Sequence, residues 1–303
     1  MTSQTLVRPE LGTVIVGVDG SPPAREAALW AADEAQRRDR ALYLVHAADT
    51  DRSSLYFPAE DLRTVREEGR ELLRETARAL RDRHPGLTVV EELSGLEPVA
   101  GLTATAGRQG TIVVGSRGLG GFASLMLGSV GLGVAARATV PVVVVRGDGD
   151  RPEAGSVTAA VHGASDLGWL PVAAAEARAR KASLRLLSVW NVLTHVGSVA
   201  TMLDDLDEIA RARVLEVKGL ADLVRRAYPE LTVSHHVEPG TSTPGALVEA
   251  GAHTDLLVLG AEHHALGVGP ALGRVAHTVL HHSPCPVEIV PPDFAAREAR
   301  ERT

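Results

Sequence analysis

The sequence predicts an α/β protein that contains two doubly wound parallel sheets in tandem. Short runs of β-branched and apolar residues alternate with segments whose apolar residues recur at helical spacing, which is the pattern of β-α-β units. The apolar runs are unbroken, as expected for parallel strands that are covered on both faces. The pattern also repeats, because three pairs of residues lie 145 positions apart: Gly115 and Gly260, Gly128 and Gly273, and Pro141 and Pro286.

In the first half, the elements begin with a strand at 13–18 that ends in Asp19-Gly20-Ser21-Pro22, a combined turn and helix-start signal. Alanines at helical spacing then predict a helix at 24–38 that packs closely on the sheet. The other expected elements are a strand at 41–47, a long amphipathic helix at 60–84, a strand at 88–93, a helix at 98–107, a strand at 111–114, a helix at 130–139 and a strand at 140–145.

The second half repeats this order. The expected strands are 157–161, 183–190, 232–237, 256–260 and 286–290, and the expected helices are 171–181, 204–228 and 244–253. We therefore expect a first domain at 1–146, a Gly-, Asp-, Glu- and Pro-rich linker at 147–155, a second domain at 156–292 and a charged tail at 293–303. We assign no function to the tail.

The composition excludes several classes of protein. A net charge of −7 argues against a general electrostatic grip on nucleic acid or an anionic membrane, and 3% aromatic residues are too few for base-stacking platforms. The single cysteine, Cys285, forms no internal disulfide. Neither a signal peptide nor a run of about 18 apolar residues is present. We expect a soluble, cytoplasmic protein that binds neither nucleic acid nor membranes.

The residues with the clearest chemical meaning are Gly115-Ser116-Arg117-Gly118, followed after nine residues by Gly128-Ser129. A glycine-rich crossing from a strand end to a helix start lets backbone N–H groups approach an anion, and the helix dipole favours negative charge there. In a doubly wound sheet, Asp19 at the end of the first strand and Gly115 at the end of the fourth face one crevice. The chain has no Gly-Lys for a Walker loop and no Gly-x-Gly-x-x-Gly after its first strand, which leaves a mononucleotide held mainly by backbone amides.

Gly17-Val18-Asp19-Gly20-Ser21 and the Gly-x2-Gly-x9-Gly-Ser spacing resemble the universal stress protein family, in its ATP-binding subgroup and tandem-domain type. The resemblance covers the whole chain. It implies two Rossmann-like domains of the adenine nucleotide alpha hydrolase type, each a five-stranded parallel sheet with helices on both faces. It also implies a cytoplasmic, ATP-binding role in stress response or dormancy.

The resemblance also implies roles for individual residues of the first domain. Gly17, Val18 and Asp19 would contact the nucleotide, and Ala47 would line the adenine pocket through its main chain. Ribose and phosphates would meet residues of the glycine loop and the next helix start: Gly115, Ser116, Arg117, Gly118, Leu119, Gly120, Gly121, Gly128, Ser129 and Val130. Because Asp19 is an acid beside a polyanion, we expect Mg²⁺ or Mn²⁺ to bridge it to the phosphates. The alternatives are that Asp19 caps the first helix and that the loop is a surface turn without a ligand.

The second domain departs from this pattern. His162 stands where the first domain has Asp19, His263 replaces Gly118, and Arg274 replaces Ser129. We therefore predict that it binds ATP weakly or not at all, although Arg274 would favour some other anion. His277 and His281 are four residues apart and would share a helical face, but we favour solvated surface histidines over a metal site.

Three functions remain open from the sequence. The leading hypothesis is a regulator whose ATP occupancy alters its interactions with unknown protein partners. The first alternative is an enzyme that hydrolyses ATP slowly. Rapid catalysis is not expected, because no strong pair of nucleophile and base accompanies the site. The second is a nucleotide-independent interaction module.

The resemblance also implies how the two domains assemble. The apolar last strands of the two domains would pair within one chain, and a homodimer is a further option.

Overall fold

The computed structural model describes residues 6–107, 110–118, 127–146, 151–191, 203–261, 272–295 and 297. The predicted site residues Leu119, Gly120 and Gly121 lie outside the described residues, as does His263. Contacts divide the chain into two compact units. The N-terminal unit is residues 11–150, and the C-terminal unit is residues 151–303 together with the segment that ends at residue 10.

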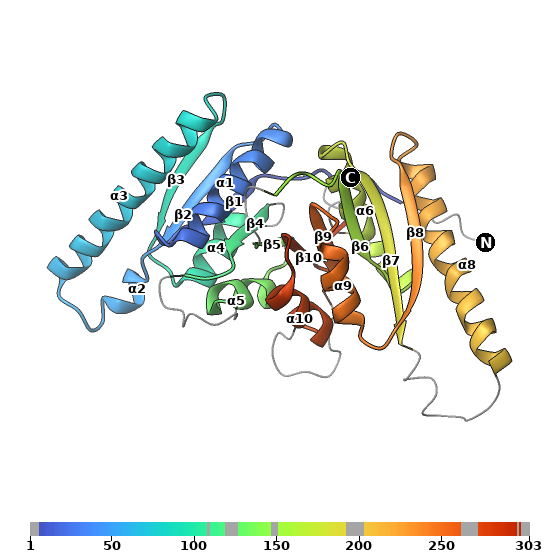
Figure 1. Ribbon diagram of the computed structural model, residues 1–303. Helices are drawn as coiled ribbons and strands as arrows, with labels where there is room; N and C mark the ends of the chain where they lie inside the picture. The colour runs from blue at the N-terminus through green and yellow to red at the C-terminus, as the bar shows by residue number, and fades with distance from the viewer. Residues whose placement is uncertain are drawn as a thin grey trace. The chain divides into compact units, whose positions relative to one another are not determined.

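The described part of the N-terminal unit contains a parallel sheet with the strand order β3-β2-β1-β4-β5. Its strands are β1 (Val14–Gly17), β2 (Leu42–Ala47), β3 (Val89–Ser94), β4 (Thr111–Gly115) and β5 (Val142–Val145). The chain runs from β1 outward through β2 to β3, and then returns to the other side of β1 to add β4 and β5 (Figure 1). The direction of winding therefore reverses between β1 and β4.

Helices cover both faces of this sheet. They are α1 (Pro22–Arg37), the short α2 (Thr50–Ser53), α3 (Ala59–Arg83), α4 (Pro98–Ala106) and α5 (Ser129–Arg137). Helix α1 contacts α3, and α4 contacts α5, as right-handed crossovers in opposite directions require of helices on opposite faces. Helix α1 lies close to the strands because the side chains that it turns toward them are buried alanines.

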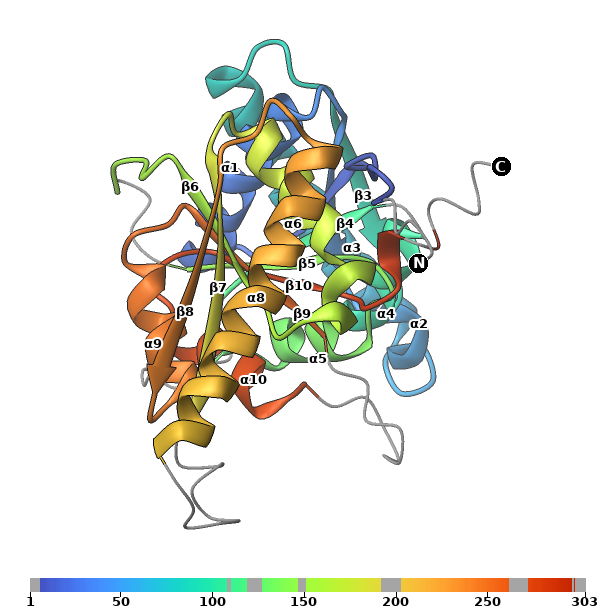
Figure 2. The same ribbon diagram turned by 90° about the vertical axis from the view of Figure 1, so that its right-hand side faces the viewer.

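The C-terminal unit repeats this arrangement in its described residues, with the strand order β10-β9-β6-β7-β8. Its strands are β6 (Ser156–Ala160), β7 (Ser183–Asn191), β8 (Val233–Gly240), β9 (Leu256–Gly260) and β10 (Val287–Val290). Its helices are the 3₁₀ helix η1 (Ala164–Gly168), α6 (Leu170–Ala179), α8 (Leu203–Ala227), α9 (Thr243–Gly251) and α10 (Arg274–His282). Figure 2 shows α8 running along β7 and β8, and α9 contacts α10. The predicted fold class is confirmed, and the pairing of the last strands stays a prediction.

Three of these elements, namely α2, η1 and α10, are not among those that the sequence predicts. Each is short, and α2 and η1 are too short to carry a helical repeat of apolar residues. The long helices α3 and α8 are amphipathic, with charged residues on their outer faces. No helix in the described ranges combines the length and the apolar character that crossing a membrane requires.

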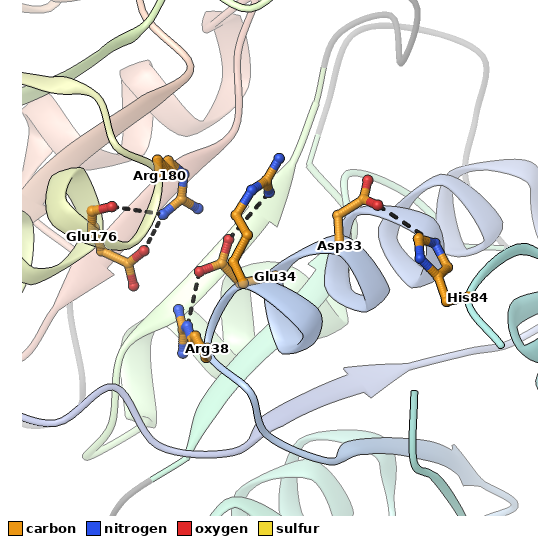
Figure 3. Close-up of polar contacts among 7 residues, drawn as sticks. Asp33, Glu34, Arg38, His84, Glu176 and Arg180 are labelled. Atoms are coloured by element: carbon orange, nitrogen blue, oxygen red, sulfur yellow. Dashed lines mark hydrogen bonds and ion pairs between the residues drawn. The ribbon is translucent and has the colours of Figure 1, made fainter. Parts of the chain in front are cut away.

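Both units place a buried carboxylate near the end of their first α-helix, α1 or α6. Glu34 of α1 is fully buried, and Arg38 Nε donates to its Oε1 at 2.8 Å, while Arg38 Nη1 donates to Thr111 Oγ1 of β4 at 2.8 Å. In the C-terminal unit, the fully buried Glu176 pairs with Arg180 in the same way (Figure 3). An ion pair one helical turn apart keeps each buried charge compensated, which a lone buried charge would not be.

The segment that precedes the first strand belongs to the C-terminal unit through Arg8. Its Nε donates to the carbonyl of Ala227 at 2.6 Å, and its guanidinium lies 4.6 Å from the ring centroid of Tyr228. An ion pair to Glu230 at 3.4 Å completes the contact. Tyr228 itself is fully buried, and its hydroxyl donates to the carbonyl of Pro171 at 3.3 Å. Arg8 thus covers one face of a buried tyrosine.

Burial raises the pKa of Tyr228 to about 12, although the positive charges of Arg178 and Arg8 oppose the rise. A pKa that is higher in the folded than in the unfolded state gives stability that is complete below pH 10 and lost as the pH rises through 12. We predict that the free energy of unfolding, measured in urea, falls more steeply between these pH values for the wild type than for Tyr228→Phe. Tyr56→Phe, at a ring that is 78% exposed, is the control and should keep the wild-type slope. Equal slopes for the wild type and Tyr228→Phe would contradict the prediction.

Candidate functional site

The candidate site lies at the carboxyl ends of β1 and β4 in the N-terminal unit. These strands are parallel neighbours with Val14 opposite Thr111 and Val16 opposite Val113, so that Gly17 and Gly115 come at the same edge of the sheet. Because the winding direction reverses between these two strands, the connections that follow them leave toward opposite faces. A crevice between the connections is the usual place for a ligand in such a sheet.

Gly115 allows the start of α1 to pack against the end of β4. A Cβ atom on Gly115 would lie only 2.5 Å from the carbonyl oxygen of Pro23 and 3.0 Å from the nitrogen of Ala24. The absence of a side chain is therefore a packing requirement. It holds whether or not a ligand binds nearby.

Asp19 and Gly118 face each other across the crevice. Asp19 Oδ1 accepts a hydrogen bond from the backbone N–H of Ser21 at 2.9 Å, which turns the carboxylate toward the loop after β4. A Cβ atom on Gly118 would overlap the second carboxylate oxygen, Oδ2. Gly118 thus leaves room for a carboxylate next to a bare stretch of backbone.

The structure contradicts the alternative in which Asp19 caps the first helix. The N-cap of α1 is Ser21, whose Oγ accepts a hydrogen bond from Ala24 N at 3.3 Å. The same buried hydroxyl donates to the carbonyl of Arg117 at 3.5 Å. Ser21 therefore ties the helix start to the glycine loop, a role that the sequence analysis missed although it had recognised Ser21 as part of a helix-start signal.

The ends of the glycine loop are held together. Gly128 N donates to the carbonyl of Ser116 at 2.9 Å, and a Cβ atom on Gly128 would lie 3.5 Å from Arg117 Cα and 3.7 Å from Gly118 N. The two glycines of the predicted spacing are thus close in space as well as matched in sequence. Ser116 and Arg117 are half-buried, and Gly118 is exposed.

Helix α5 begins directly after this closure. Its N-cap is Gly128, with φ −65° and ψ 156°, and no side chain caps its first turn. Ser129 is exposed and Val130 is half-buried at this end. The first amides of a helix point outward along its axis and carry partial positive charge, so this end of α5 is suited to an anion.

On the other side of Asp19, the residues predicted to contact the nucleotide are engaged with β2. Val18 N donates to the carbonyl of Val45 at 2.9 Å, and Val18 O lies 2.8 Å from His46 Nδ1. Both main-chain polar groups of Val18 thus have partners within the protein, and its contact with a nucleotide stays a prediction. Ala47 ends β2 opposite Ser94 and is half-buried. A Cβ on Gly17 would touch Leu102 at 3.0 Å, so Gly17 faces α4.

Two arginines bring positive charge to the same edge of the sheet. Arg146 directly follows β5, whose Val145 lies opposite Gly115, and Arg117 comes two residues after Gly115. Burial lowers the pKa of Arg146, and the positive charge of Arg117 lowers it further. Arg117 belongs to the site residues predicted from the sequence, whereas Arg146 does not, because no motif marks it.

The C-terminal unit has a different arrangement at the corresponding strand ends. Trp169 lies against Gly260, where a Cβ atom would overlap the indole nitrogen. Asp166 Oδ1 accepts a hydrogen bond from Trp169 Nε1 at 3.1 Å, and Asp166 Oδ2 accepts from the backbone of His162 and of Gly163. Gly273 caps α10 without a side-chain hydrogen bond, and Arg274 is exposed.

The rings of His277 and His281 on α10 contact each other at an angle of 45°, with their centroids 4.5 Å apart. His277 is exposed, but His281 is buried, so the expectation of a solvated surface histidine is wrong for His281. Within the parts of the chain that the structure describes, no group of three or more His, Cys, Asp and Glu side chains is arranged to hold a metal ion.

Comparisons with known proteins agree on one family. A model described as the universal stress protein family matches residues 10–146 and 164–291. A universal stress protein of Mycobacterium tuberculosis is 35% identical over 46% of this chain and 46% of its own length, so the match spans about half of that relative. A second one from the same organism is 28% identical over 90% of this chain and 95% of its own length.

One solved structure shows the same fold over most of the chain. The crystal structure of a universal stress protein from Archaeoglobus fulgidus has a TM-score of 0.70 and 16% identity, and the match covers 92% of this chain and 98% of that one. Two further universal stress protein structures, one in complex with cAMP and one from Archaeoglobus fulgidus in complex with dAMP, match 45% of this chain with TM-scores of 0.36 and 0.33.

The close packing at Gly115 leads to a test of the geometry. We predict that Gly115→Ala lowers the free energy of unfolding by about 1–3 kcal/mol, because the added methyl group meets the backbone of Pro23, which has little freedom to move. Gly86→Ala is the matched control, since a Cβ atom there has no neighbour within 4 Å, and it should change stability by less than about 0.5 kcal/mol. Urea unfolding of the two variants measures both values, and equal stabilities would refute the close approach.

Proposed function

Because the chain belongs to the universal stress protein family, we propose that its N-terminal unit binds ATP at the carboxyl ends of β1 and β4 and acts as a regulator. In this proposal, nucleotide occupancy changes the surface that the unit presents to protein partners during stress or dormancy. Mg²⁺ or Mn²⁺ accompanies the nucleotide and is held between Asp19 and the phosphates. The C-terminal unit does not share this activity.

The observation that carries the proposal is the open backbone around Gly118 and Gly128. Two residues without side chains lie together beside the uncapped first turn of α5. Backbone N–H groups and a helix N-terminus at one point form a binding place for phosphate groups that needs no lysine. A flexible surface turn would not need its two ends joined by the hydrogen bond between Gly128 and Ser116.

The charges around the site support a polyphosphate more than a single phosphate. The positive charge of Arg117 lowers the pKa of Arg146, and Asp19 turns Oδ2 toward Gly118. An anion that reaches both regions gains attraction at the arginines and meets repulsion at Asp19. A divalent cation at Asp19 converts that repulsion into a bridge, which is why we include Mg²⁺ or Mn²⁺.

The first prediction concerns the space at Gly118. We predict that Gly118→Glu weakens ATP binding by at least about a hundredfold, equivalent to about 2.7 kcal/mol, because its side chain fills the cradle and adds a negative charge. Gly86→Glu carries the same charge change at an exposed turn with open space and should bind as the wild type does. Isothermal titration calorimetry on nucleotide-free protein with ATP and Mg²⁺ measures both. Unchanged binding by Gly118→Glu would place the site elsewhere.

The second prediction concerns the cation. In Mg²⁺, Asp19→Ala should bind ATP about tenfold more weakly than the wild type, because one cation ligand is lost. In EDTA the variant should bind ATP more tightly than the wild type, since it no longer repels the phosphates. Ser54→Ala, at a residue outside the site, serves as the control and should follow the wild type in both buffers. The same effect of Asp19→Ala with and without Mg²⁺ would argue against a bridging ion.

Phosphate release during long incubation separates the regulator from the slow ATP hydrolase. Turnover that disappears in Asp19→Ala while binding persists would favour the hydrolase. Heat-denatured, freshly purified protein should release ATP or ADP into the supernatant. If no nucleotide is released and apo protein gives no binding heat, the nucleotide-independent interaction module replaces the proposal.

A further inference from the structure

The C-terminal unit contains a cavity of about 490 Å³ at the carboxyl ends of β6 and β9. The residues that line it come from strand ends and from helices. The apolar side chains among them include Ala160, Leu247, Leu259, Val275 and Ala276. Binding sites for small organic molecules have volumes of about 300–1,000 Å³ and mostly apolar walls. The cavity therefore has the size and the lining of a site for a small molecule.

The cavity occupies the place that corresponds to the phosphate end of the N-terminal site. Gly260 and Gly273 line it, and these residues stand 145 positions after Gly115 and Gly128. Ala160 ends β6 as Gly17 ends β1. The ends of the first and fourth strands thus lie at the candidate site in the N-terminal unit and at the cavity in the C-terminal unit.

Trp169 and Asp166 make one wall of the cavity rigid. The indole is 2% exposed and lies against Gly260, and its nitrogen is fixed by Asp166 Oδ1 at 3.1 Å. Asp166 Oδ2 accepts from the backbone N–H of Gly163 at 2.9 Å and from that of His162. These contacts hold the wall in place without a ligand, and a preorganised wall lowers the entropy cost of binding.

The described lining residues disfavour a phosphate. Among them, Asp166 is 9% exposed and contributes a carboxylate, His162 is the one basic side chain, and lysine and arginine do not occur. A phosphate group would thus meet the negative charge of Asp166, and no lysine or arginine of the described lining would balance it. An uncharged ligand avoids this cost, because the carboxylate is already compensated by two backbone amides and the indole N–H.

We propose that this cavity is a second ligand site that binds a compact, uncharged and mainly apolar organic molecule of about two fused rings, and that it rejects phosphorylated compounds. The C-terminal unit is then a sensor of a different class of compound from the N-terminal unit. The inference does not require that the N-terminal unit binds ATP, because each site is tested by its own probe.

The test uses the full chain and a neutral naphthalene dye, 6-propionyl-2-(dimethylamino)naphthalene. The variant Trp30→Phe/Trp190→Phe leaves Trp169 as the only tryptophan of the three, so that quenching of its emission reports binding next to the cavity. We expect saturable quenching by one dye per chain. The anionic dye 8-anilinonaphthalene-1-sulfonate should bind at least about tenfold more weakly, and ATP with Mg²⁺ should not displace the neutral dye.

Two sets of variants fix the location. Ala160→Leu fills the cavity from β6 and should reduce dye affinity at least about tenfold, and Val275→Phe fills it from α10 if the first variant does not fold. The control removes a run of exposed apolar side chains away from the cavity, where Leu55, Tyr56 and Phe57 are 77%, 78% and 58% exposed. The triple change of these residues to Ser should leave dye binding intact.

Several results would overturn the proposal. These are the absence of saturable quenching, equal affinity for the neutral and the anionic dye, and displacement of the neutral dye by ATP. Binding that survives a folded cavity-filling variant, or that disappears with the triple surface variant, would overturn it as well.

Discussion

The arrangement of the candidate site depends on the close packing of the first turn of α1 against the end of β4 at Gly115. There, the backbone of Pro23 takes the space of the missing side chain. This packing brings Ser21 within hydrogen-bond distance of Arg117, which holds the loop after β4 near the loop after β1. Asp19 and Gly118 come face to face as a result. A methyl group at Gly115 would separate the two loops, and with them the groups that face the crevice.

Much of the fold could be predicted from the sequence because the strands are short unbroken apolar runs and the long helices have periodic faces. The predicted strand at 256–260 coincides with β9, and the predicted helix at 60–84 differs from α3 by one residue at each end. The order of β-α units then determines the winding, because crossovers between parallel strands are right-handed. The place where the winding reverses depends on the strand order β3-β2-β1-β4-β5, which the order of elements along the chain does not determine by itself.

The contacts inside the site could not be predicted in the same way. Ser21 was recognised as a turn residue, but its bond to Arg117 joins residues 96 positions apart, and no local pattern encodes such a distance. Arg146 follows β5 as an ordinary strand-ending residue, and only the register of β4 with β5 places it near Arg117. Trp169 and Asp166 lie in or beside a 3₁₀ helix that has no counterpart at the start of α1. Sequence motifs therefore locate backbone turns better than they locate the side chains that face them.

The two units differ in the hydrogen bonds that are donated to the carboxylate after the first strand, which is Asp19 in one unit and Asp166 in the other. Asp19 is half-buried, accepts a hydrogen bond from Ser21 N and turns its other oxygen toward Gly118. Asp166 is buried, and its two oxygens accept bonds from the backbone of His162 and Gly163 and from Trp169. A carboxylate of the first kind is suited to hold a cation beside phosphates, and one of the second kind serves as a structural support for an apolar wall.

Because Gly115 and Gly260 both relieve contacts with the protein itself, a glycine at this strand end follows from packing in either unit. The chemistry of each site is then determined by the residues around the glycine, and the retained glycine alone does not identify the ligand.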